Sequence, residues 1–173
     1  MTSNNVEYSN IGRITGFSLT GRIKPMGIAE EGNLKLEVET QTSMVGLECF
    51  IYGNEPHDLH VGKLKDNDYV KLQFTLLADI DRMQRITGRV KNIILSHESK
   101  ENSARSNIDY IVNGEILRIE EHPNPDMARN HVRIILDCGI YVYTTAAKTL
   151  QLKVGDYISL EGRLDAHILG KVN

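Results

Sequence analysis

Apolar and polar residues alternate along most of this chain, and the alternation has a period of two residues. Leu34, Leu36 and Val38 form one set, and Lys35 and Glu37 form the other. The same spacing assigns two further sets to a buried face: Leu47, Cys49 and Ile51, then Val70, Leu72 and Phe74. A period of two predicts strands with one buried face. Because long amphipathic helical patterns are absent, we expect an all-β protein.

Breaks in the alternation predict how the strands are connected. We expect a further strand at 85–93, and polar loops at 24–33 and 120–130. The remaining gaps, at 55–64 and 146–152, have the length of short helices. A glycine lies inside one strand of each half, at Gly21 and Gly114, where it suits a sharp bend.

The second half of the chain repeats the pattern of the first. Segments 64–72 and 152–160 share Leu, Lys, Asp, Tyr and Leu at a constant offset. Earlier segments follow in the same order: 17–23 with 110–116, 34–38 with 132–136, and 46–50 with 139–143. Between the halves, 96–107 has no large apolar residue and is typical of a linker. We therefore expect two domains, at 1–95 and 108–173.

Each half shows three strands, a gap of helix length and two more strands, and this order resembles the OB-fold. Residues 155–164 (GDYISLEGRL) are similar to the fourth strand of nucleic-acid-binding OB domains. The resemblance implies two tandem OB-fold-like five-stranded Greek-key barrels. The second copy ends soon after Ile168, so its last strand must be short, borrowed or missing. A barrel left open in this way invites pairing with another chain.

The OB resemblance also implies a binding face on strands two and three, flanked by loops. Single strands are held there by aromatic stacking, worth about 1–3 kcal/mol per base, and by basic contacts. The outward positions that match in the two halves are Lys35 with Arg133 and Phe50 with Tyr143. Tyr52 and Tyr141 add an aromatic residue on the same face of each copy. Basic residues of the expected loops join them: Arg82, Arg85, Arg118 and Arg129.

Other interpretations of these residues remain open. An outward aromatic ring can instead pack under a loop or against the sister domain, since aromatics are common on strands. Glu37 and Glu48 lie on the expected face of the first copy and would repel phosphate, so the second copy looks the better binder. Tyr69 and Tyr157 recur at the start of strand four, where packing is the favoured interpretation and a contact between barrels the alternative.

Charge and composition narrow the classes of function. The formal net charge of −3 argues against binding duplex DNA through bulk charge. Cys49 and Cys138 are far apart and are expected to be buried. The chain begins without a signal-peptide pattern and contains no membrane-length apolar run, so we expect a cytoplasmic protein that does not enter membranes. We found no pattern typical of a nucleotide loop, a metal site or a catalytic triad, and we expect no cofactor and no enzymatic activity.

These patterns predict a non-catalytic protein that binds single-stranded DNA. Binding should weaken with salt because phosphate contacts release counterions. The sequence does not separate RNA from DNA as the ligand. The alternative is a protein–protein interaction module that uses the same barrel faces or an open barrel edge, with a homo-oligomer as one form of it.

Overall fold

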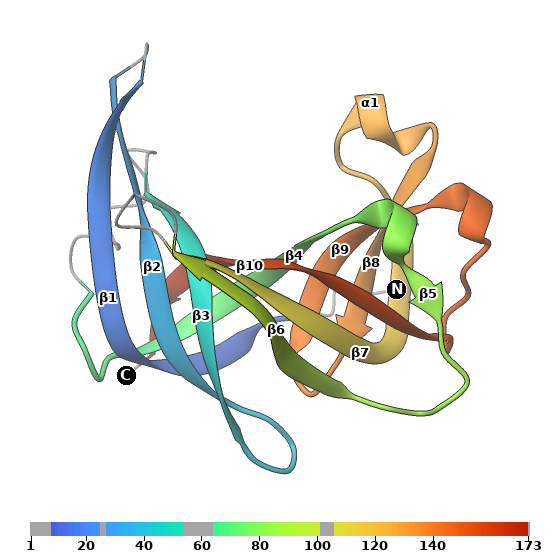
Figure 1. The fold of residues 1–173 in the computed structure, drawn as a ribbon, viewed down its shortest axis with the longest axis horizontal. Coiled ribbons are helices and arrows are strands. Elements are labelled where there is room, and N and C mark those ends of the chain that lie inside the picture. The colour runs from blue at the N-terminus through green and yellow to red at the C-terminus, as the bar shows by residue number, and fades with distance from the viewer. Residues whose placement is uncertain (1–7, 25–26, 54–63, 101–105, 173) are drawn as a thin grey trace, which may run out of the picture.

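The computed structural model describes residues 8–24, 27–53, 64–100 and 106–172, with the backbone alone at 19–24, 27–31, 52–53, 97–100 and 106–107. It confirms an all-β protein (Figure 1). The strands are β1 Asn10–Lys24, β2 Gly27–Glu39, β3 Met44–Gly53, β4 Tyr69–Ala78, β5 Gln84–Arg85, β6 Asn92–Lys100, β7 Ser106–Glu121, β8 His131–Asp137, β9 Tyr141–Ala147 and β10 Tyr157–Lys171. The short helical turns are η2 Ile80–Arg82, α1 Pro125–Ala128 and η3 Lys148–Leu150.

Two strands, β4 and β10, pair with strands from both halves of the chain. They pair with each other in antiparallel register at Leu76 and Leu164. The first part of β4 pairs with β1, and β4 then runs parallel to β9. Likewise, the first part of β10 pairs with β7, and β10 then runs parallel to β3. Figure 1 shows these two strands running between the β1–β3 and β7–β9 groups.

The pairings close two circuits of five strands that share β4 and β10. The first circuit is β1–β2–β3–β10–β4, and the second is β7–β8–β9–β4–β10. In each circuit, the fifth strand is the C-terminal part of a strand whose N-terminal part pairs within the other circuit. The second circuit therefore includes the C-terminal part of β4, and the C-terminal part of β10 completes the first circuit.

The predicted fifth strand at 85–93 is wrong. Within this range only Arg85, in the two-residue strand β5, and Asn92 and Ile93, at the start of β6, are in strands. β5 pairs with β10 at Ser159 and Ile158. Strand structure resumes with β6, which pairs with β7. The physical reason is that the C-terminal part of β10 lies beside β3, in the place that a local fifth strand would need.

Several predicted loops belong to strands. Most of the polar segment 24–33 lies in β1 and β2, which pair up to Lys24 and Gly27. Within the predicted linker 96–107, residues 96–100 extend β6 and residues 106–107 begin β7. The predicted helix at 55–64 lies almost wholly outside the described residues. In 146–152, β9 ends at Ala147 and the only helical structure is the turn η3. The division into domains at these boundaries stays a prediction.

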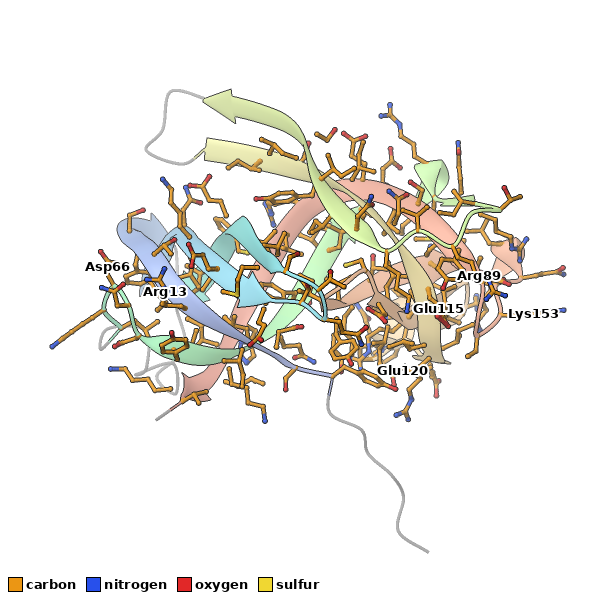
Figure 2. All side chains as sticks on the ribbon, turned by 90° about the horizontal axis from the view of Figure 1, so that it is seen from below. Arg13, Asp66, Arg89, Glu115, Glu120 and Lys153 are labelled. Carbon is orange, nitrogen blue, oxygen red and sulfur yellow. The ribbon has the colours of Figure 1, made fainter. Side chains whose placement is uncertain are left out.

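Two turns that match in sequence also make the same hydrogen bonds. Asp68 accepts from the Lys65 N–H at 2.9 Å, as Asp156 does from Lys153 at 2.9 Å. Each turn docks on the first strand of its circuit, through Ile14 or through Ile116. The turns lie at opposite ends of the molecule, where Figure 2 labels Asp66 and Lys153.

The predicted inward positions form the core. The side chains of Leu34, Leu36, Val38, Val70, Leu72 and Phe74 are at most 1% exposed. Gly162 lies where β10 crosses β4, and a Cβ atom there would be 2.1 Å from the carbonyl oxygen of Leu77. Gly114 likewise permits a close approach, since its Cβ would be 2.4 Å from the Asp137 carbonyl oxygen. In the described part of the chain, every helix is too short to cross a membrane.

Candidate nucleic-acid interface

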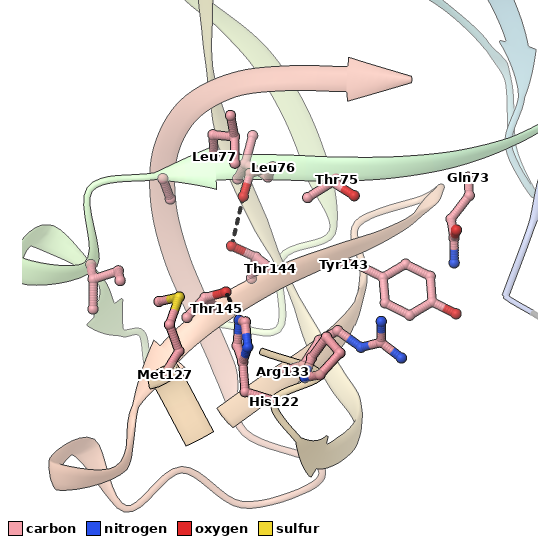
Figure 3. A pocket seen from close by; sticks show the side chains of 13 residues that line it. Gln73, Thr75, Leu76, Leu77, His122, Met127, Arg133, Tyr143, Thr144 and Thr145 are labelled. Carbon is pink, nitrogen blue, oxygen red and sulfur yellow. Dashed lines mark hydrogen bonds between the residues drawn. The ribbon is translucent and has the colours of Figure 1, made fainter. Parts of the chain in front are cut away.

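A groove of about 530 Å³ lies on the second circuit, between β4, β9 and the loop that joins β7 to β8 (Figure 3). Its lining is mixed in chemistry. Polar side chains come from β4, β8, β9 and the loop: Gln73, Thr75, His122, Arg133, Tyr143, Thr144 and Thr145. Apolar side chains, among them Leu77, Ile80 and Met127, complete the walls.

Arg133 and Tyr143, both predicted from the sequence, come together in this groove. The guanidinium carbon of Arg133 lies 4.8 Å from the centre of the Tyr143 ring. Arg133 also donates to the Glu120 carboxylate, which Arg118 approaches at 3.4 Å. Two guanidinium groups thus share one carboxylate.

Hydrogen bonds anchor the β7–β8 loop beside the groove. Asn124 donates its backbone N–H to Nδ1 of His122 at 3.1 Å. The Nε2 atom of the same ring is then the protonated one, and it donates to the Thr145 hydroxyl at 3.0 Å. The Asn124 side chain caps α1 by accepting from Asp126 N–H. Below the groove, the Thr144 hydroxyl donates to the Leu76 carbonyl at 2.9 Å and fixes β9 against β4.

At the matching position of the first circuit, an arginine also lies over the aromatic ring. Phe50 is only 3% exposed, because β10 runs beside β3 and places Arg163 over its ring at 4.6 Å. Arg163 donates two hydrogen bonds to Asp165, at 2.8 and 3.2 Å. Tyr143 is also buried, at 9%. The expectation that these two aromatic rings lie open to solvent is therefore wrong, since what faces solvent above each ring is an arginine.

Lys35 lies in a different groove, of about 450 Å³, between the first circuit and the β6–β7 hairpin. Its ammonium is 4.0 Å from Glu48. The Glu48 N–H donates to the Tyr110 hydroxyl at 2.8 Å, which fastens the hairpin onto β3. The hairpin therefore covers part of the face predicted for the first copy.

The other predicted site residues are dispersed. Arg85 donates to the carbonyl oxygens of Leu150 and Gln151 at 2.6 and 2.5 Å, so it holds a loop in place. Arg82 and Arg129 are exposed, Arg82 beside Asp79 and Arg129 at the end of α1.

The backbone of Tyr141 exchanges two hydrogen bonds with the Asn10 side chain, and its ring meets Tyr8 edge-on at 5.4 Å. Tyr52 lies on β3, and its side chain is outside the described residues.

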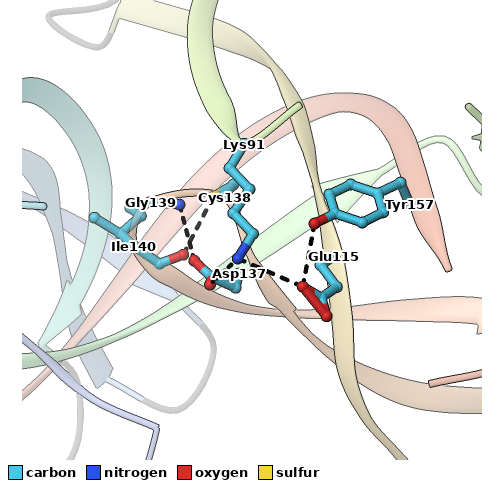
Figure 4. Close-up of polar contacts among 7 residues, drawn as sticks. All are labelled: Lys91, Glu115, Asp137, Cys138, Gly139, Ile140 and Tyr157. Carbon is cyan, nitrogen blue, oxygen red and sulfur yellow. Dashed lines mark hydrogen bonds and ion pairs between the residues drawn. The ribbon is translucent and has the colours of Figure 1, made fainter. Parts of the chain in front are cut away.

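The two strand-four tyrosines have different surroundings. The Tyr157 hydroxyl donates to Glu115 at 3.2 Å, which agrees with a packing role, whereas Tyr69 is 53% exposed. Glu115 also belongs to a polar cluster, in which Lys91 contacts Asp137 at 2.9 Å and Glu115 at 3.4 Å (Figure 4). The hydrogen bond to Asp137 is the main reason why the pKa of Lys91 is raised.

Sequence reasoning missed His122, Thr75, Thr145 and Arg163. The first three residues lie in no recognisable sequence motif. Thr75 reaches the groove only because β4 pairs with β9. Arg163 lies in the matched fourth-strand segment, but nothing in its own half indicates Phe50 as its neighbour. Within the described residues, no cluster of histidine, cysteine and carboxylate groups fits a metal ion.

Comparison with known proteins adds no identification. No protein-family model matches the chain, and no curated protein matches it significantly.

Proposed function

We propose that this protein binds single-stranded nucleic acid, with DNA as the ligand to test first, and that it performs no chemistry on it. In this proposal, the two five-strand circuits are OB-type barrels that have exchanged their fifth strands. Support comes from the three-strand meander and five-strand closure of each circuit, which fit a five-stranded Greek-key barrel. The matching turns at Asp68 and Asp156 support an origin of the two halves by duplication.

The observation that carries the proposal is the Arg133–Tyr143 pair in the groove of the second circuit. Nucleic-acid bases stack on aromatic rings and on the flat faces of arginine guanidinium groups. One face of Arg133 lies on Tyr143, and its side chain remains 36% exposed. A base can therefore stack on the outer face of this guanidinium, while the exposed Thr75 hydroxyl offers a hydrogen bond to its edge.

Electrostatics favours this circuit over the first. Arg118 and Arg133 share the Glu120 carboxylate, and the adjoining loop exposes Arg129 together with one acid, Asp126. In the first circuit, Lys35 faces Glu48, and the hairpin occupies part of the surface. Because the whole chain has a net charge of −3, binding should depend on this local charge and weaken with salt.

The test is fluorescence anisotropy with labelled oligo-dT of about 30 nucleotides, long enough to fill an OB site of about 4–16 nucleotides, at low and moderate salt. We expect Arg133→Gln and Tyr143→Leu each to weaken binding about 10-fold, since a base stack is worth about 1–3 kcal/mol. Lys35→Gln is the matched control. It removes one positive charge at the aligned position of the first circuit and should bind like the wild type.

Two results would contradict the proposal. If the wild type binds no oligonucleotide at low salt, the nucleic-acid function is wrong. If it binds and Arg133→Gln has the wild-type affinity, the function stands and the groove is not its site.

A second candidate function, docking of a protein chain, is favoured by one observation. The strand β6 lies at one end of the sheet order and exposes Ile94 and Leu95, at 49% and 54%. Sheet edges with exposed apolar residues are places where another chain can add a strand. This candidate becomes the better one if no oligonucleotide binds.

A further inference from the structure

The two aromatic positions predicted from separate halves lie in one row across the molecule. Phe50 on β3 is in register with Asp165 on β10, and Asp165 is in register with Thr75 on β4. Thr75 is in turn in register with Tyr143 on β9. Side chains of residues in register point to the same face of a sheet. The shared strands β10 and β4 therefore join the two aromatic positions into a single surface.

Each end of this row carries the same arrangement. Arg163 lies 4.6 Å above the Phe50 ring, and Arg133 lies 4.8 Å above the Tyr143 ring. The arginine side chains are 28% and 36% exposed. Neighbouring strands are about 4.8 Å apart, so three steps from β3 to β9 separate the rings by roughly 14 Å. Such a distance is short enough for one nucleic-acid strand to contact both ends.

The middle of the row is accessible. Thr75 is exposed, and Leu77, which lines the groove, is 50% exposed. Asp165 is the one carboxylate in the row, and its two hydrogen bonds from Arg163 hold that guanidinium beside the ring. We name the surface formed by Phe50, Thr75, Leu77, Arg133, Tyr143, Arg163 and Asp165 the crossing strip.

We propose that the crossing strip binds one continuous single strand, whose bases stack on both Arg133 and Arg163. This inference rests on the proposed function and extends it, because the ligand crosses from one circuit to the other over β4 and β10. The strands it follows are β3, β10, β4 and β9, in place of two separate faces on strands two and three. Asp165 opposes binding, because its charge repels phosphate and competes for Arg163.

The test compares three variants with the wild type by anisotropy on the same oligo-dT. Arg163→Gln and Arg133→Gln should each weaken binding about 10-fold, and the double variant about 100-fold, because sites more than about 10 Å apart contribute additively. Asp165→Asn should tighten binding several-fold. Asp66→Asn is its matched control. It removes the same charge from an exposed turn at one end of the molecule and should leave the affinity unchanged.

The outcomes separate this inference from the proposed function. If Arg133→Gln binds more weakly and Arg163→Gln binds like the wild type, the crossing strip is wrong and the groove alone is the site. If the wild type does not bind, the proposed function itself fails. Damage to the fold cannot imitate the expected result, because Asp165→Asn must gain affinity. A gain no larger than that of Asp66→Asn would also overturn the strip.

Discussion

Two thiols show how burial controls chemistry at the scale of single residues. Cys49 on β3 and Cys138 in the turn between β8 and β9 are each 2% exposed. Burial disfavours the charged thiolate, and it raises the pKa of Cys138 to about 12 and the pKa of Cys49 well above its ordinary value. The Cys138 thiol also donates to the Ile140 carbonyl at 3.3 Å. Because the thiolate is the reactive form, both cysteines should be inert in the folded protein.

Alkylation by iodoacetamide at about pH 8, near the ordinary pKa of a free thiol, tests this expectation. A raised pKa keeps each thiol protonated at this pH, so labelling should be slow in the native protein and fast in denaturant. Mass spectrometry of timed samples would measure both sites. Equal labelling rates in native and denatured samples would contradict the burial of these residues.

At the scale of elements, the crossing of β4 and β10 depends on a residue without a side chain. The backbone of β4 passes so close to Gly162 that a Cβ atom would lie 2.7 Å from the Cα of Ala78. These contacts are with backbone, which has little room to move. Any side chain at this position must push the two strands apart.

We expect Gly162→Val to destabilise the protein by roughly 3 kcal/mol or more, as overpacking against backbone does. Urea unfolding followed by circular dichroism would measure the change. Gly46→Ala is the control, because a Cβ at Gly46 meets nothing within 4 Å. Similar losses in both variants would show that the crossing is not the sensitive point.

At the scale of the whole molecule, the two circuits are interdependent. Neither closes without a strand that begins in the other, and their buried residues form one continuous core. Unfolding one circuit removes the fifth strand of its neighbour. The two should therefore unfold together.

Calorimetry should then show a single transition, with a van't Hoff enthalpy equal to the calorimetric enthalpy. Leu36→Ala in the first circuit and Ile134→Ala in the second should both lower this one transition, since each large-to-small core change costs about 2–5 kcal/mol. Both side chains are at most 1% exposed. Two separate transitions, each sensitive to only one variant, would mean that the circuits fold independently.

Two residues that line the candidate groove, Arg133 and Tyr143, could be predicted from the sequence, but the arrangement around them could not. Alternation and repeat placed Arg133 and Tyr143 at matching outward positions, and the structure brings them within 4.8 Å. The cover over Phe50 was missed, because Arg163 lies far from it in sequence and reaches it only through the β3–β10 pairing. The groove likewise depends on Thr75 from β4, which belongs to the first half of the chain.

The sequence by itself determined that the fold is all-β, and it determined the buried side of alternating segments such as 34–38 and 70–74, because the pleat alternates every two residues. It also determined the two matching turns, since Lys65–Asp68 and Lys153–Asp156 hold their shape by local hydrogen bonds. Only the tertiary structure decided which strands pair. Alternation is the same for any partner, and a long strand can serve two circuits as well as one. The sharing of β4 and β10 by the two circuits, and the row of residues in register across them, follow from that choice of partners.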